Sequence, residues 1–192
     1  MIFPNFTPEA APLSFWGTVL VLTVISLAAI VVTMRYPQRW LVMLAGGTLL
    51  IAVLMVAVPH PAPSTPIVAM VGVAALGLST IGGGPAVMFV LALASRGSVI
   101  EGSHGGIVVD EAKRHEVLRG GTTIGVFERF ATTAAIMVSL PEAVAVVVAI
   151  KGVGRFTELD APEARERFII GTLVSLVWAC ACGALFRLTA GV

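Results

Sequence analysis

Three long apolar stretches follow one another in the first half of the chain, separated by short polar or proline-rich segments. A membrane-spanning helix needs about 20 apolar residues to cross a hydrocarbon core of about 30 Å. The apolar stretches of the whole chain predict an all-α polytopic membrane bundle of about six transmembrane helices in a single domain over residues 1–192. The predicted spans are residues 14–34, 40–58, 67–95, 121–139, 141–156 and 167–186.

The third stretch is too long for one straight span, because residues 67–95 would form a helix of about 43 Å. It contains the sequence IGGGP at residues 81–85. Three glycines and a proline inside an apolar helix predict a break, at Gly82, Gly83, Gly84 and Pro85. One interpretation is an exposed helix start after the break, whose free N–H groups attract an anion. The other is a close-packed kink where glycines let a neighbouring helix approach, and the pattern favours this second interpretation.

The second half begins with a polar segment, residues 96–120, in which a short surface helix is expected over 110–118. The next apolar run is interrupted by SLPE, where Ser139 and Glu142 have the spacing of a capping box and Pro141 suits a first helical turn. One helix is therefore expected to end near Ser139 and a short fifth helix to follow it. A second capping box, formed by Asp160 and Glu163, is expected to open the last helix.

The positive charges alternate between the two ends of the predicted spans. Two Lys or Arg residues follow the first span, four lie in residues 96–120 and four lie in residues 151–167, whereas the other two connections have none. Positive residues stay on the cytoplasmic side of a membrane. We therefore expect an inner-membrane protein with a cytoplasmic loop at 96–120 and with both termini outside; Arg187 alone opposes this orientation.

Composition supports lipid as the solvent. The chain is 57% hydrophobic and 12% charged, against about 25% charged for ordinary soluble domains. The net charge of +1 gives no reason to expect a nucleic-acid partner. The first apolar run follows an acidic residue and no Lys or Arg, so it is expected to be a retained span and not a cleaved signal.

Five charged residues at or near the ends of the fourth and fifth predicted spans form a candidate cluster: Glu128, Arg129, Lys151, Arg155 and Glu158. The topology places Glu128 about 10 Å and Lys151 about 8 Å from the cytoplasmic face, on adjacent antiparallel helices. An unpaired charge at mid-membrane costs about 2.5–3.5 kcal/mol, so an ion pair between Glu128 and Lys151 is expected. Arg129 points elsewhere and needs another partner, such as a lipid phosphate or Glu158.

Three interpretations of this cluster stay open at the level of sequence. The charges can fix the helix register or extend towards the headgroups. Arg129, Lys151 and Arg155 can instead form a binding site for an anionic headgroup or substrate. Glu128 can also lie on a path for protons or ions.

Signatures of enzymes and metal sites are not found in the sequence. It has no G-x-S-x-G, H-E-x-x-H or P-loop motif. Cys180 and Cys182 lie in the last apolar run without a histidine at metal-ligand spacing, and we interpret them as packing residues. His60, His104 and His115 all lie outside the predicted spans. The sequence thus predicts no catalytic residue, no metal site and no cofactor.

The last third of the chain resembles an uncharacterised family of small bacterial multi-pass membrane proteins, known as a domain of unknown function. The resemblance is carried by IGVFER at 124–129, PEAVAVVVAIKGVGRFTEL at 141–159 and ERFIIGTLVS at 166–175. It covers about residues 121–186. The positions that match the family pattern are Gly125, Glu128, Arg129, Glu142, Ala143, Lys151, Arg155, Phe156, Ile170, Gly171 and Thr172. Some longer members have a histidine in the first helix, which this chain lacks. The resemblance implies that the charged residues act as a unit, and it implies no particular activity.

The expected function is that of a non-enzymatic membrane protein. Its charge cluster would bind an anionic lipid or a membrane partner, such as a second copy of the chain, as an accessory to envelope lipid handling or transport. The alternative is a small transporter or channel that uses Glu128 as a coupling carboxylate. A lipid-phosphate enzyme would need a nucleophile near the cluster, for which the sequence offers only Thr132 and Thr133.

Overall fold

Six helices make up most of the described chain. The computed structural model describes residues 10–60, 62–94, 100–101, 107–108, 116–117, 121–155 and 162–191. The helices are α1 (Ala10–Arg35), α2 (Arg39–Val56), α3 (Thr65–Ala94), α4 (Gly121–Met137), α5 (Glu142–Arg155) and α6 (Pro162–Ala190). The predicted all-α class is therefore confirmed at the level of the architecture.

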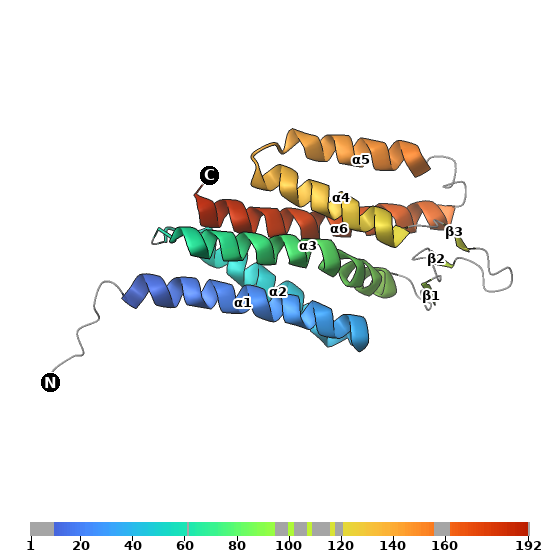
Figure 1. The fold of residues 1–192 in the computed structure, drawn as a ribbon. Coiled ribbons are helices and arrows are strands. Elements are labelled where there is room, and N and C mark those ends of the chain that lie inside the picture. The colour runs from blue at the N-terminus through green and yellow to red at the C-terminus, as the bar shows by residue number, and fades with distance from the viewer. Residues whose placement is uncertain are drawn as a thin grey trace.

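A small antiparallel sheet lies at one end of the helices (Figure 1). Its two-residue strands are β1 (Ile100–Glu101), β2 (Ile107–Val108) and β3 (Glu116–Val117), paired in the order β1-β2-β3. The prediction of a helix over residues 110–118 is wrong for residues 116–117, because these form strand β3 and pair with β2. The other residues of that expected helix, and His104, lie outside the described residues.

Four helices are long and apolar enough to cross a membrane: α1 from Leu13, α2, α3 and α6. Their outward faces carry large apolar side chains such as Val21, Leu50 and Leu54. A helix that is apolar on every face is typical of a protein interior or a membrane span, and here the outward faces have no protein cover. The chain is thus a multi-pass membrane protein.

The two remaining helices are shorter, and six spans are not confirmed. The 17 residues of α4 and the 14 residues of α5 give lengths of about 26 and about 21 Å, below the hydrocarbon thickness of about 30 Å. The apolar run from 121 to 150 was expected to supply two spans. It supplies a helical hairpin instead, because a turn divides it before either helix reaches full length.

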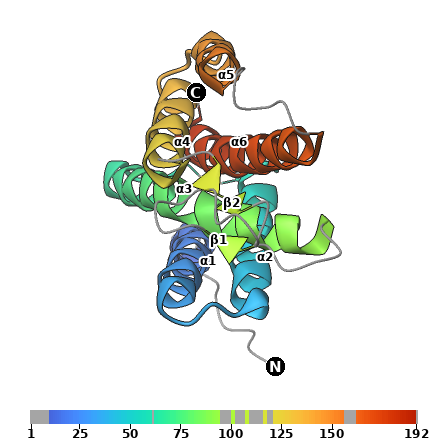
Figure 2. The same cartoon turned by 90° about the vertical axis from the view of Figure 1, so that its right-hand side faces the viewer.

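The long helices α3 and α6 lie at the centre of the bundle and pack against each other along their length (Figure 1). Helices α1 and α2 cover one side of this pair, and α4 covers the other (Figure 2). Helix α5 is outermost and packs chiefly on α4. The start of α1 and the end of α6 lie at the same end of the bundle, opposite the sheet.

Helix α3 continues through the IGGGP sequence, so the predicted break at Gly82–Pro85 is not confirmed. Pro85 is inside the helix and leaves the Ile81 carbonyl without its usual N–H partner. The glycines serve close packing: an added Cβ at Gly82 would lie 2.7 Å from the Trp178 ring on α6. Neighbouring helices can hold a proline-containing helix together in a membrane, which explains why α3 does not separate here.

The turn between α4 and α5 differs from the capping box that the sequence suggests. Ser139 has a φ of 63°, the left-handed conformation of a residue that ends a helix, and not the extended conformation of an N-cap. The Leu140 N–H donates to the Ala135 carbonyl at 2.8 Å, and the Ser139 N–H donates to the Ile136 carbonyl at 3.1 Å. These bonds form a Schellman motif that satisfies the end of α4 without water. The turn can therefore lie at membrane depth.

The glycine packing of α3 predicts a contrast between two neighbouring positions. Gly82→Ala places a methyl group against Trp178, whereas a Cβ at Gly84 meets no atom within 4 Å. We expect Gly82→Ala to lower the free energy of unfolding by about 1–3 kcal/mol through overpacking. The control, Gly84→Ala, should be neutral or stabilising by up to about 1 kcal/mol. Equilibrium unfolding in mixed detergent measures both, and equal effects would contradict the packing role of Gly82.

Candidate functional site

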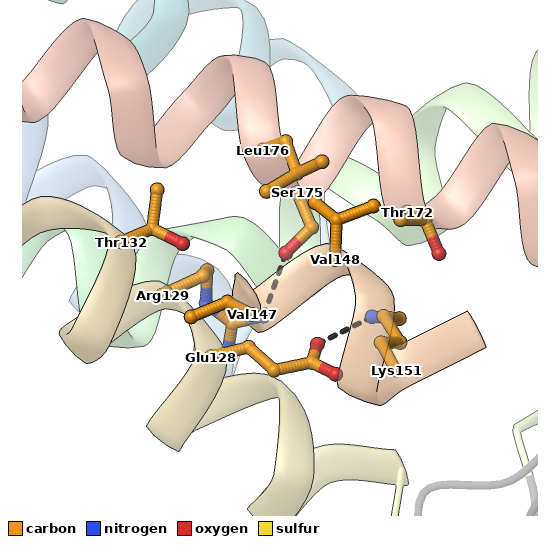
Figure 3. A pocket seen from close by; sticks show the side chains of 9 residues that line it. All are labelled: Glu128, Arg129, Thr132, Val147, Val148, Lys151, Thr172, Ser175 and Leu176. Atoms are coloured by element: carbon orange, nitrogen blue, oxygen red, sulfur yellow. Dashed lines mark hydrogen bonds and ion pairs between the residues drawn. The ribbon is translucent and has the colours of Figure 1, made fainter. Parts of the chain in front are cut away.

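Two adjacent residues of α4 direct opposite charges to different neighbours. Glu128 extends towards α5, and Arg129 extends into the interior between α3 and α6 (Figure 3). Successive residues of a helix point about 100° apart, which separates the two side chains although they are neighbours in sequence. Helix α4 therefore presents a carboxylate to its outer partner and a guanidinium to the core.

The ion pair expected between Glu128 and Lys151 is confirmed. The Lys151 ammonium donates to the Glu128 carboxylate, and the two side chains are 19% and 14% exposed. The same ammonium lies 5.9 Å from the centre of the Phe168 ring on α6, within the range of a cation–π contact. The pair thus connects α5 to α4 and, through the aromatic ring, to α6.

Arg129 is 6% exposed, and its described hydrogen-bond partners are groups of α3 and α6. Its Nε and one terminal nitrogen donate to the Thr80 carbonyl on α3 at 3.1 and 2.9 Å, and the other terminal nitrogen donates to the Ser175 hydroxyl on α6 at 3.4 Å. A lipid phosphate or Glu158 was the expected partner. Glu158 and the Arg155 side chain lie outside the described residues, and the partners that are described are neutral protein groups.

Two glycines make room for the guanidinium. An added Cβ at Gly83 would lie 2.2 Å from Cδ of Arg129, and one at Gly125 would lie 3.0 Å from its terminal nitrogen. No other residue type can stand at Gly83 while Arg129 keeps this position. The glycine sequence of α3 therefore serves the charge cluster as well as the contact with Trp178.

A network of hydroxyl groups continues from Arg129 through the same three helices. Ser79 on α3 lies 2.6 Å from the Thr133 hydroxyl on α4, and the Thr133 hydroxyl donates to the Ala179 carbonyl on α6 at 3.1 Å. Gly183, one turn beyond Ala179, packs against Ile136 on α4, as small residues do where two membrane helices approach closely. Bonds of this kind hold helices together where apolar burial gives no driving force.

Beside Arg129 lies a small cavity between α4, α5 and α6 (Figure 3). Its volume is about 10 Å³, which leaves room for about one water molecule. Three aliphatic side chains and six polar ones line it, and the polar ones are Glu128, Arg129, Thr132, Lys151, Thr172 and Ser175. The hydroxyls of Thr132 and Thr172 are buried and have no hydrogen-bond partner among the described residues.

Sequence reasoning missed most of the neutral polar residues of this site, namely Ser79, Thr80, Thr172 and Ser175. A usable signal was present on α4, where Thr132 and Thr133 stand four residues after Glu128 and Arg129 and so share their helix faces. On α6, Thr172 and Ser175 have the equivalent spacing of three. Polar residues three or four positions from a charged residue, or from each other, within an apolar run are thus candidates for the same site.

Other residues with possible chemistry lie apart from the cluster. Cys180 and Cys182 are free thiols within α6. His60 lies against Phe15 and Trp16, and its Nε2 is 3.3 Å from the Leu188 carbonyl. Within the described ranges, no three His, Cys, Asp or Glu side chains gather as metal ligands.

A double-mutant cycle tests the pair between α4 and α5. Glu128→Gln and Lys151→Met should each lower the free energy of unfolding by about 1–3 kcal/mol, less than for a fully buried pair because both side chains keep some exposure. The double variant should cost less than the sum of the two, with a coupling of about 0.5–3 kcal/mol. Additive effects in equilibrium unfolding would show that the two charges do not act on each other.

The chain was also compared with known proteins, and no protein-family model, curated protein or solved structure matches it. The resemblance of residues 121–186 to a family of small membrane proteins accordingly stays a prediction. The function has to be inferred from the arrangement of the charged and polar side chains.

Proposed function

We propose that this membrane protein binds the phosphate group of an anionic lipid at the cluster between α4, α5 and α6, as an accessory to lipid handling or transport in the cell envelope. The observation that carries the proposal is an excess of positive charge. Glu128 is already paired with Lys151, whereas Arg129 has only neutral partners among the described residues. Two cations and one carboxylate leave a net charge of +1 inside a membrane protein, and an anion offsets such a charge.

Lys151 is the member of the cluster that a lipid can reach. Its side chain is 19% exposed on α5, the outermost helix. An ammonium has three donors, so Lys151 can keep its bond to Glu128 while it donates to a lipid phosphate. Arg155 stands one turn later on the same face of α5 and is the second residue proposed for this contact.

The proposed orientation brings this contact to the cytoplasmic headgroups. The positive charges of the chain favour the inner membrane, with both termini outside and with the sheet end of the bundle on the cytoplasmic side. Lys151 and Arg155 lie near the end of α5 that approaches the start of α6. Both termini lie on the same side of the membrane whether the α4–α5 hairpin crosses the membrane or returns within it, because the hairpin begins and ends on one side.

The alternative of a transporter or channel coupled through Glu128 is less well supported. A path for ions needs a continuous polar or water-filled route. The cavity at Glu128 has room for about one water molecule, and Glu128 is held by Lys151. This closed arrangement favours a binding role for the cluster.

Native mass spectrometry tests the lipid site. The protein is released from nanodiscs that contain phosphatidylglycerol, or phosphatidylcholine as the zwitterionic comparison, and retained lipids are counted. We expect Lys151→Ala to weaken retention of phosphatidylglycerol about fivefold, since one cation near a membrane surface contributes about 1 kcal/mol. Arg35→Ala removes the same charge at the α1–α2 connection and should leave retention unchanged. Equal losses in both variants, or equal retention of both lipids, would contradict the proposal.

Cysteine labelling tests the orientation. In a chain with Cys180→Ala and Cys182→Ala, a new cysteine is placed at Gly191 after α6, or at Tyr36 between α1 and α2. A membrane-impermeant maleimide added to intact spheroplasts should label the Gly191→Cys chain. It should label the Tyr36→Cys chain only after the membrane is opened. The reverse pattern would place the sheet end of the bundle outside.

A further inference from the structure

Helix α5 covers the cavity between α4, α5 and α6 without burying any of its own described side chains. None of the side chains of residues 142–154 is buried, and α5 packs chiefly on α4 (Figure 2). The polar contact that holds it there is the ion pair of Lys151 with Glu128. In lipid, apolar contact between helices gains little over contact with the acyl chains. Helix α5 can therefore leave its position at low cost once that pair is broken.

Two threonine hydroxyls beneath α5 have no hydrogen-bond partner among the described residues, Thr132 on α4 and Thr172 on α6. A helical threonine commonly donates to the carbonyl four residues earlier. Six threonines of this protein do so, namely Thr18, Thr23, Thr33, Thr48, Thr80 and Thr189. Thr132 and Thr172 line the cavity instead, where the nearest side chains of α5 include two valines. A buried hydroxyl without a partner destabilises the state that buries it, so the closed position of α5 has a cost at both threonines.

The polar side chains of α4 and α6 at the cavity form a polar seam along these helices, made up of Glu128, Arg129, Thr132, Thr172 and Ser175. Two hydrogen bonds between α4 and α6 each join residues 46 positions apart, which sets the register of the helices. Thr132 is thus level with residue 178, six residues beyond Thr172, or about 9 Å along the bundle. Figure 3 shows Thr172 on the Lys151 side of the cavity and Thr132 on the opposite side. No single ion or water can bond to both, so the seam is a strip of separate polar groups.

The closed cavity is too small for a lipid headgroup, because its volume of about 10 Å³ leaves room for about one water molecule. The groups that suit a phosphate lie inside it all the same. Arg129 uses three of its five N–H groups on Thr80 and Ser175, which leaves two. The Glu128 carboxylate lies in the same seam and repels a phosphate, so both cations are needed there. Arg129 and Lys151 together leave a charge of +1 after Glu128.

The turn at Ser139 is a suitable hinge between α4 and α5. The N–H groups of Ser139 and Leu140 bond back to carbonyls of α4, and the first turn of α5 begins with the N–H of Ala143 on the Leu140 carbonyl. Each helix therefore satisfies its own end. A rotation about the backbone between them breaks neither set of bonds. Lys151 lies far from this turn on α5 and moves most when the helix rotates.

We propose that α5 is a lid that turns about Ser139 and opens the polar seam to the phosphate group of the bound lipid. The inference rests on the proposed function and adds a route to it. Lys151 makes the first contact at the exposed edge, and Thr172 and Arg129 donate to the phosphate once the lid is open. A lipid that binds the open state more tightly than the closed state shifts the lid towards it.

A reversible cross-link tests whether the lid must open. Val148 on α5 and Leu176 on α6 line the cavity from two helices. In a chain with Cys180→Ala and Cys182→Ala, oxidation of the pair Val148→Cys and Leu176→Cys fixes α5 to α6. We expect retention of phosphatidylglycerol in native mass spectrometry to fall about fivefold, as for the loss of one cation, and to return when the disulfide is reduced. Equal retention in the oxidised and reduced chains would overturn the lid.

The matched control is a cross-link between helices that the lid does not involve. The Ser26 hydroxyl on α1 donates to the Ala45 carbonyl on α2 at 2.8 Å. Oxidation of the pair Ser26→Cys and Ala45→Cys in the same background should leave lipid retention unchanged. An equal loss in this chain would show that cross-linking acts on the whole bundle, and would overturn the assignment of the effect to α5.

Pulsed electron spin resonance measures the motion without a cross-link. Nitroxide labels are attached to Val153→Cys on α5 and Val177→Cys on α6, two sites whose native side chains are exposed. We expect two distance populations, and the longer one should grow in nanodiscs with phosphatidylglycerol compared with phosphatidylcholine. A single distance that is the same in both lipids would overturn the lid.

Valine substitutions test the cost of the closed position. Thr132→Val with Thr172→Val removes both unpartnered hydroxyls, so we expect the midpoint temperature of unfolding to rise by at least about 2 °C and the longer distance to become rarer. Thr23 is equally buried but bonds to the Val19 carbonyl, so Thr23→Val should lower the midpoint. A lower midpoint in the Thr132/Thr172 variant would show that closure leaves no unpaired hydroxyl, against the proposal.

The lid and the lipid site fail in different ways. Loss of retention in Lys151→Ala, together with no response to the α5–α6 cross-link, would keep the lipid site and overturn the lid alone. Equal retention of both lipids in the unmodified protein would contradict the proposed function, and the lid as a route to it.

Discussion

The attachment of the Arg129 guanidinium to the Thr80 carbonyl is the interaction on which the arrangement of the second half of the protein depends. It buries a positive charge between α3, α4 and α6, where its hydrogen-bond partners among the described residues are neutral groups. Such a charge is tolerated only with well-placed acceptors and enough space. Gly83 and Gly125 provide the space, and the Thr80 carbonyl on α3 and the Ser175 hydroxyl on α6 are the acceptors. The Arg129 side chain on α4 therefore depends on the glycine sequence of α3 for its space.

Helix α5 depends on its charge for a different reason. None of its described side chains is buried, and it packs chiefly on α4. In lipid, apolar contact between helices gains little over contact with the acyl chains. The pair between Lys151 and Glu128, aided by the Phe168 ring, is thus the main specific contact that holds α5 at the cavity. The Schellman motif at Ser139 fixes the other end of the hairpin.

The two described cations of the cluster lie in different surroundings. Lys151 offers its charge at the outer face of the bundle, where a lipid phosphate can approach. Arg129 holds its charge inside, where it donates to the Thr80 carbonyl and the Ser175 hydroxyl. The cluster has one carboxylate for two described cations.

Much of the fold follows from the sequence, since the apolar runs predict six helical segments, and four of these are long and apolar enough to span a membrane. The ion pair of Glu128 and Lys151 could also be predicted from the sequence, because two charges at similar depth on adjacent helices have few other ways to be stabilised. The division of residues 121–155 into two short helices could be located only roughly. The role of Ser139 depends on a left-handed backbone conformation that a serine seldom adopts.

The sequence by itself determined that the chain lies in a membrane, which segments form its long helices, and which charges must find partners. These properties depend on the composition and spacing of nearby residues. Only the tertiary structure decided that Arg129 bonds to α3, that Gly82 and Gly83 admit Trp178 and Arg129, and that Thr132 and Thr172 face one cavity. These contacts join residues about 40 to 100 positions apart, and they depend on which faces of the helices meet. In lipid, apolar patterning does not specify those faces, because every side of a span is apolar.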